Sequence, residues 1–122
     1  MSTEVDLDEL GKVLTNYRFA YLMTVGNEAR PHAVAVVPSI ADGELLIREP
    51  GSRTLANALA RPTVSLVWPP ADADDYSLIV DGTASDGTDG LRISPTRAVL
   101  HRPAPSPDDT GPCGSDCREL TT

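Results

Sequence analysis

Long hydrophobic runs are absent from this sequence, and aromatic residues make up only 4% of its 122 residues. No stretch approaches the run of about eighteen apolar residues that a membrane-spanning helix needs, and no basic N-terminal segment leads into an apolar one. The sequence therefore predicts no membrane span and no signal peptide, and we expect a cytoplasmic protein. Because large rings are scarce, its single core must be built from Val, Leu, Ile and Ala.

Positive charge is also scarce. The chain carries 18 acidic residues against 10 basic ones, which gives a net charge of −8, and Lys12 is its one lysine among arginines. A protein that binds nucleic acid needs a basic face to neutralise phosphates, so we expect no nucleic-acid partner. Any anion site in such an acidic chain has to be local, made by a few arginines and helix ends.

Cysteine and histidine are represented by two residues each. Cys113 and Cys117 are too few for a disulfide framework, and they supply two ligands where a structural zinc needs four, so we predict no metal site. We interpret them as free thiols, with a disulfide or a redox pair as alternatives. We interpret His32 and His101 as exposed or strand-edge residues, and we nominate no catalytic side chain because no arrangement typical of nucleophilic catalysis is present.

Six short strand-like runs separated by turn signals, with two helical patterns between them, indicate a small antiparallel β-barrel. A helical pattern begins at Asp6, and a second is expected to bury Leu55 and Leu59. Asp42-Gly43 indicates a hairpin, and Pro38 marks a sheet edge, a bulge or a place where the strand stops pairing. The strands are expected at residues 19–25, 29–39, 44–48, 63–68, 76–84 and 91–102, the last broken at residue 95, and the second helix at residues 53–60.

The most informative stretch is residues 44–70, in which a strand pattern, a turn, a short helix and a second strand pattern follow one another. Ser52, Arg53 and Thr54 stand at the start of the helix, where backbone N–H groups lack intrahelical partners and attract an anion. Hydroxyl and guanidinium groups there suit a phosphate. The alternative is that Ser52 caps the helix and Arg53 is a solvated surface charge.

Within this stretch, Gly51-Ser52-Arg53-Thr54, Arg61-Pro62 and Val64-Ser65-Leu66-Val67-Trp68-Pro69 follow one another at a spacing that resembles the pyridoxamine 5'-phosphate oxidase-like family of FMN-binding split barrels. Residues 77–84 are similar to a later strand of that family. The resemblance implies a mainly β fold, a six-stranded antiparallel split β-barrel with two short helices, over residues 1–102. Residues 103–122 are rich in proline, contain both cysteines and are predicted to be a flexible tail.

The resemblance also implies a cofactor site. The phosphate of FMN would lie at the start of the second helix and beside the end of the preceding strand, and the isoalloxazine ring would lie against residues 36–39. A deazaflavin is the alternative cofactor, although its acidic tail calls for more cations than this chain offers. The residues assigned to the cofactor are Val36, Val37, Pro38, Ser39, Arg48, Glu49, Ser52, Arg53 and Thr54.

The function implied is that of an oxidoreductase that transfers hydride or electrons between the flavin and a small-molecule substrate. Nothing after Leu91 matches the basic segment with which true pyridoxamine phosphate oxidases grip their substrate, so that reaction is not expected. The alternative is a non-catalytic protein that binds or stores a flavin or another phosphate-bearing ligand. The resemblance further implies a homodimer, in which Tyr21, Trp68 and Tyr76 are either partner-facing or plain core aromatics.

Overall fold

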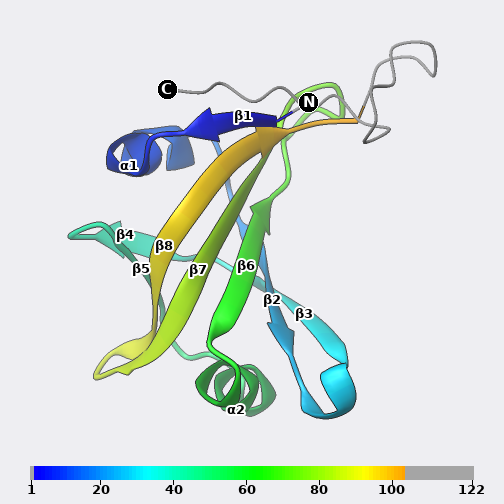
Figure 1. The fold of residues 1–122 in the computed structure, drawn as a ribbon. Coiled ribbons are helices and arrows are strands. Elements are labelled where there is room, and N and C mark those ends of the chain that lie inside the picture. The colour runs from blue at the N-terminus through cyan, green and yellow to red at the C-terminus, as the bar shows by residue number, and fades with distance from the viewer. Residues whose placement is uncertain (1, 104–122) are drawn as a thin grey trace.

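The computed structural model describes residues 2–103, which form eight strands, two α-helices and two short 3-10 helices (Figure 1). The elements are β1 (Ser2–Val5), η1 (Leu7–Glu9), α1 (Leu10–Leu14), β2 (Ala20–Val25), η2 (Asn27–Ala29), β3 (Pro31–Val36), β4 (Ser39–Ala41), β5 (Glu44–Ile47), α2 (Ser52–Ala60), β6 (Thr63–Trp68), β7 (Ser77–Gly87) and β8 (Gly90–His101).

All strand pairs in the described residues are antiparallel, and the strands follow the order β3-β2-β6-β7-β8-β5-β4, with β1 beside β8. Within this part of the chain, β3 and β4 stand at opposite ends of the order and are not joined, so the sheet curves without closing. The expected split barrel is confirmed, but it has eight strands rather than six.

The two additional strands have different origins. β1 pairs with the C-terminal half of β8, from Val5 opposite Ala98 to Ser2 opposite His101. The expected strand at residues 29–39 is divided into β3 and β4 around Pro38, which has no N–H to donate to a ladder. The apolar run of β3 is not buried on both faces, because β3 is an edge strand and none of its residues is fully buried.

The predicted hairpin is confirmed, but the predicted break in the last strand is not. Asp42 and Gly43 have φ angles of 55° and 79°, the positive values that a tight two-residue hairpin requires. β8 continues through the proline at residue 95 instead of stopping there. Asp81 lies opposite Arg97, whereas Gly82 lies opposite Pro95, so one extra residue forms a bulge that accommodates the proline.

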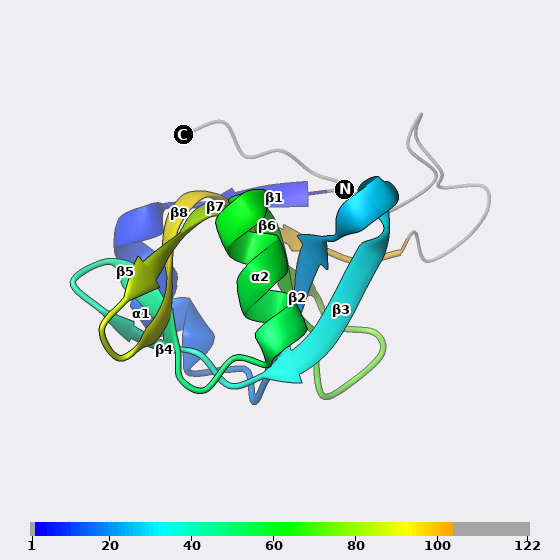
Figure 2. The ribbon, with the colours of Figure 1, turned by 90° about the horizontal axis from the view of Figure 1, so that it is seen from below.

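The core lies on the concave face of the sheet, which α2 covers from below (Figure 2). The buried face of α2 consists of Thr54, Asn57 and Ala58. Leu59 is 45% exposed, so the expectation that it is buried is wrong.

Neither α-helix in the described residues has the length and apolar character needed to cross a membrane. The buried apolar side chains are Leu10, Ala20, Leu22, Leu45, Ile47, Ala58, Val64, Leu66, Trp68, Leu78, Val80, Ala84, Leu91, Ile93, Ala98 and Val99.

Candidate functional site

A cavity of about 570 Å³ lies in the split of the barrel, between edge strand β3 and strand β5. We call it the split cavity. Figure 2 shows the C-terminal end of β3 beside the start of α2, which borders one end of the cavity. Its lining residues are Val34, Ala35, Val36, Val37, Ser39, Leu46, Ile47, Arg48, Glu49, Pro50, Gly51 and Thr54.

One wall of the split cavity is apolar. Val34 and Val36 lie on the side of β3 that packs against the core, and Ile47 of β5 faces them from the other end of the sheet. β3 pairs with β2 along one edge, and no other described strand pairs along its second edge. Backbone groups on that second edge can therefore hydrogen-bond a polar ligand, while the valines cover its apolar surface.

The other end of the split cavity is polar. Gly51 is the N-cap of α2, and its carbonyl accepts the first intrahelical bond, from the N–H of Leu55 at 2.9 Å. The N–H groups of residues 52–54 consequently have no partner within the helix. Ser52 is the first helical residue and not the cap, so the interpretation that it merely caps the helix is wrong. The first turn of α2 contains no acidic residue, which leaves its positive dipole end uncompensated by its own side chains.

Six of the nine residues assigned to a cofactor line the split cavity together: Val36, Val37, Ser39, Arg48, Glu49 and Thr54. Pro38 lies in the link between β3 and β4 but not in the lining. Ser52 and Arg53 line a second cavity of about 570 Å³, on the other flank of the helix start. Successive helical residues point about 100° apart, which explains why residues 52–54 are divided between two cavities.

This second cavity, which we call the flank cavity, carries a mixed set of charges. Besides Ser52 and Arg53, it is lined by Glu28, Arg30 and His32. The last three come from η2 and the start of β3, which pack beside the first turn of α2. The two arginines give this side of the helix start a net positive character that the acidic chain as a whole lacks.

A contact that the sequence analysis did not identify joins the two cavities. His32 is half-buried on β3, and its Nε2 lies 3.3 Å from the hydroxyl oxygen of Thr54. The sequence held a signal for this position, since alternation along β3 places His32 on the same face as Val34 and Val36, toward α2. We had interpreted His32 as an exposed or strand-edge residue, and it does lie on an edge strand, but its ring is directed at a buried partner.

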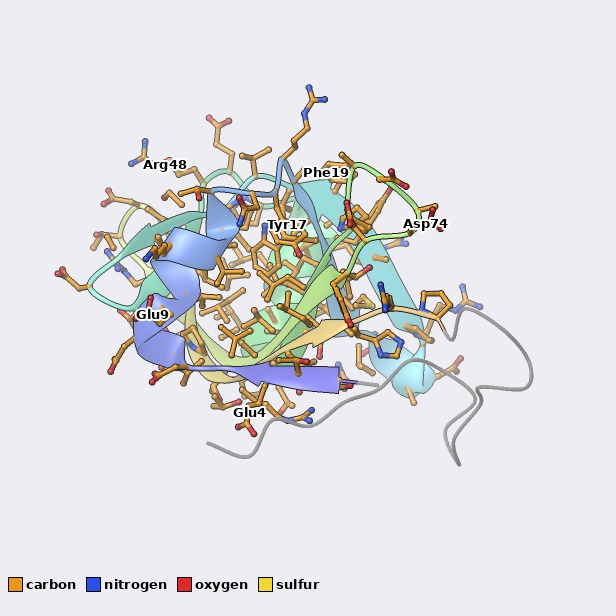
Figure 3. The ribbon with its side chains drawn as sticks, turned by 90° about the horizontal axis from the view of Figure 1, so that it is seen from above. Glu4, Glu9, Tyr17, Phe19, Arg48 and Asp74 are labelled. Atoms are coloured by element: carbon orange, nitrogen blue, oxygen red, sulfur yellow. The ribbon has the colours of Figure 1, made fainter. Side chains whose placement is uncertain are left out.

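The turn between β5 and α2 has an unusual backbone. Glu49 has a φ of 51°, in the left-handed region that side chains other than glycine seldom adopt. Arg48 and Glu49 also border a third cavity of about 580 Å³ together with Asp89 from the β7–β8 turn. Arg48 lies at the periphery with its side chain pointing away from the sheet (Figure 3). The third cavity is therefore lined by two acidic residues and one arginine, and it adjoins the split cavity at Arg48 and Glu49.

Of the three aromatic residues considered for a partner-facing role, Trp68 is 3% exposed and belongs to the core. Tyr21 is 44% exposed on the convex face of the sheet, where Met23, Val25, Val67 and Ile79 also lie. A cavity of about 520 Å³ opens on that face. We call these five apolar residues the outer face.

The described residues contain no group of three or more metal-ligating side chains. Cys113 and Cys117 lie outside those residues, as does nearly all of the predicted tail.

Comparison with known proteins found relatives but no matching family model. Two curated proteins, "Uncharacterized protein Mb0449c" of Mycobacterium bovis and "Uncharacterized protein MT0457" of Mycobacterium tuberculosis, are each 40% identical to the chain over an alignment of 132 residues. The alignments cover 93% of this chain and 93% of each relative.

Solved structures with the same fold include an FAD-binding protein from Mesorhizobium loti, with a TM-score of 0.63, 18% identity, and coverage of 82% of this chain and 96% of that one. A structure titled F420 reductase has a TM-score of 0.60 and 17% identity over 71% of this chain and 93% of that one. A conserved hypothetical protein from M. tuberculosis, Rv2991, has a TM-score of 0.56 and 24% identity over 66% of this chain. The chain spans about half of that protein's length, 52%.

Proposed function

The chain belongs to the family of the mycobacterial proteins Mb0449c and MT0457 and has the split-barrel fold of the pyridoxamine 5'-phosphate oxidase-like proteins, and from this premise we propose that it binds a flavin-type cofactor in the split cavity. The observation that carries the proposal is the cavity itself, which joins an apolar wall, an unpaired strand edge and a helix start in about 570 Å³. Pockets of this size and mixed lining suit a ligand with a flat ring and one charged end.

The start of α2 suits the phosphate of FMN. Arg48, Gly51 and Thr54 line the cavity at this end, and the N–H groups of residues 52–54 have no partner within the helix. Ser52 and Arg53 stand at the rim of the same turn, on the flank cavity side. A phosphate at this position gains charge-assisted hydrogen bonds without requiring a basic protein surface.

The apolar wall suits the isoalloxazine ring. Val36 and Val37 provide a surface against which a ring can pack, and Ser39 adds a hydroxyl at the end of that wall. The backbone edge of β3 offers donors and acceptors to the ring carbonyls and nitrogens. We propose FMN rather than a deazaflavin with an acidic tail, because Glu49 and Asp89 beside Arg48 would repel additional negative charge.

The proposed activity is that of an oxidoreductase acting on a small-molecule substrate. A bound flavin supplies the hydride or electron transfer, and the protein supplies binding, orientation and exclusion of water. The neighbouring folds titled as an F420 reductase and an FAD-binding protein support the reaction class.

We also propose a homodimer in which a second copy covers the outer face. Tyr21 and Val25 of β2 are 44% and 36% exposed. Met23 lies between them on the same strand, and Val67 of β6 and Ile79 of β7 continue the apolar surface across the neighbouring strands. Apolar residues gathered on one face of a sheet are typical of a surface that binds another protein. Sedimentation velocity of the purified chain tests this, because a monomer at micromolar concentration would contradict it.

The function is tested with the purified protein and with free cofactors. Mass spectrometry of the material that copurifies, followed by fluorescence titration with FMN and with F420, is expected to identify FMN as the tighter ligand. Bleaching of the flavin by a reduced nicotinamide, followed by reoxidation when an acceptor is added, would support the oxidoreductase. A bound flavin that never turns over would support the non-catalytic alternative, and a protein that binds neither cofactor would contradict the proposal.

A further inference from the structure

The side chain of Thr54 occupies an uncommon position for a hydroxyl group. It is 2% exposed, it lines the split cavity, and its oxygen lies 3.3 Å from Nε2 of His32. His32 comes from β3 and borders the flank cavity. The contact therefore crosses the wall between the two cavities and connects the edge strand to the start of α2.

The direction of this hydrogen bond determines what Thr54 can offer a ligand. A hydroxyl has one proton to donate, whereas a neutral imidazole nitrogen either donates or accepts. If Nε2 accepts, the hydroxyl proton is directed at His32, and only lone pairs of the oxygen face the cavity. If Nε2 carries a proton, His32 donates to Thr54, and the hydroxyl proton is free to point into the cavity. Only the second arrangement makes Thr54 a donor to an anion.

We propose that His32 is a positioning residue that donates from Nε2 to Thr54 and thereby aims the Thr54 hydroxyl proton at an anionic group in the split cavity. The inference rests on the proposed function, because the anion is taken to be the phosphate of the cofactor. The chemical class recognised is a phosphate ester, and the residue acts through Thr54 without contacting the ligand.

In the described residues, the side chain of His32 has Thr54 as its hydrogen-bond partner. Thr24 lies directly opposite His32 in the β2–β3 ladder, but its hydroxyl accepts from the side-chain amide of Asn57 at 3.2 Å. The charged groups that share the flank cavity with the ring are Glu28, Arg30 and Arg53. The tautomer or charge state that places a proton on Nε2 makes His32 the donor to Thr54, and this is the arrangement that the proposal requires.

The proposal predicts a loss that is confined to the phosphate. Riboflavin has the same ring as FMN but no phosphate, so the ratio of the two affinities isolates the anion contacts. We expect His32→Phe and Thr54→Val to weaken FMN binding roughly 10- to 100-fold, the scale of a hydrogen bond to a charged group, and to leave riboflavin binding within about twofold. Thr54→Ser keeps the hydroxyl, and His32→Gln keeps a donor, so both should retain a larger share of the FMN preference.

His101→Asn is the matched control. It removes the second of the two histidines, which lies on β8 and lines neither the split cavity nor the flank cavity. It should bind FMN and riboflavin as the wild type does. Thermal unfolding of each variant establishes that it is folded before affinities are compared. Equal losses for FMN and riboflavin would show that His32 only supports the fold. Unchanged FMN affinity in His32→Phe would overturn the proposal directly.

A second measurement does not depend on flavin binding. With His101→Asn as the background, nitrogen-15 NMR observes the ring of His32 alone, and inorganic phosphate serves as the probe. We expect phosphate to shift the Nε2 signal toward the value of a protonated ring nitrogen, and Thr54→Val to abolish that response. A shift with phosphate in a protein that binds no flavin would contradict the proposed function while supporting the inference. An Nε2 that remains an acceptor under saturating phosphate would overturn the inference.

Discussion

The side-chain amide of Asn57 donates to the hydroxyl of Thr24 at 3.2 Å, and this bond joins the buried face of α2 to the centre of β2. Asn57 is 9% exposed and Thr24 is 1% exposed, so neither group has water as an alternative partner. Gly26 approaches the same amide so closely that an added Cβ would lie 3.2 Å from its oxygen. The helix that borders both cavities is thus fixed by a polar contact inside the core.

The first prediction concerns this contact. Thr24→Val keeps the shape of the side chain but leaves the buried amide of Asn57 without its acceptor, so the free energy of unfolding should fall by about 1–3 kcal/mol. Replacing both partners, as Thr24→Val with Asn57→Leu, should recover part of that loss. Urea unfolding of the single and double variants measures both values. Identical stability of the wild type and Thr24→Val would contradict a structural role for the bond.

The second prediction is a pH dependence. The hydroxyl of the half-buried Tyr17, which is labelled in Figure 3, donates to the backbone carbonyl of Tyr76 at 2.8 Å. Burial, and secondarily the negative charge of Asp75, raises the pKa of Tyr17 above 10.0. Above pH 10 the unfolded chain therefore loses this proton while the folded chain keeps it, so stability falls until the pH passes the folded-state pKa.

Tyr17→Phe isolates this effect. The variant should be less stable than the wild type by about 0.5–1.5 kcal/mol at neutral pH, because one hydrogen bond is lost. That difference should stay constant up to about pH 9 and shrink as the pH rises past 10, since only the wild type carries the titrating hydroxyl. Urea unfolding at successive pH values provides the measurement. A difference that is constant through pH 11 would show that the Tyr17 pKa is the same in both states.

The third prediction separates the two arginines beside the start of α2. Arg48 borders the split cavity, whereas Arg53 borders the flank cavity, and both residues are exposed. Arg48→Ala should weaken FMN binding by on the order of 1.5–3 kcal/mol at low salt, and Arg53→Ala by less, because Arg53 lies on the other flank of the helix start; high salt should reduce both losses, since both charges are exposed. Fluorescence titration at low and high salt distinguishes them. A larger loss in Arg53→Ala would place the phosphate on the flank cavity side.

The fourth prediction tests the proposed dimer. Val67 lies on β6 between Tyr21 of β2 and Ile79 of β7, on the outer face. Because Val67 is only partly buried in the single chain, Val67→Glu should leave the fold intact but place a charge within the proposed interface, where it has no partner. Sedimentation should therefore show the variant as a monomer. Thr88→Glu, in the exposed turn between β7 and β8 and outside the outer face and its cavity, serves as the control and should not change the assembly.

The features that the sequence predicted correctly are those that neighbouring residues determine. Asp42 and Gly43 can adopt positive φ angles at little cost, so their turn is visible without any tertiary information. The strand expected at residues 76–84 is also visible locally, because Leu78 and Val80 are buried and alternate with less buried residues along β7. Both predictions were confirmed.

The errors arose where distant residues determine the outcome. β1 forms because Ser2–Val5 pairs with the C-terminal end of β8, and the sequence of these four residues alone does not predict that pairing. Leu59 is exposed because α2 turns Asn57 toward Thr24 and presents a small, polar face to the core. The candidate cofactor residues remain a prediction, drawn from the chemistry of the helix start and from the family resemblance; their division between the two flanks of the helix depends on tertiary packing that the sequence does not show.

The interrupted sheet has a consequence for dynamics. β7 and β8 have neighbours on both sides, whereas β3 and β4 each lack one, so amide exchange should be slowest in the former pair and fastest at the two rims. The split cavity lies between these loosely held rims. A molecule bound there would connect two edges of the sheet that backbone hydrogen bonds leave unpaired.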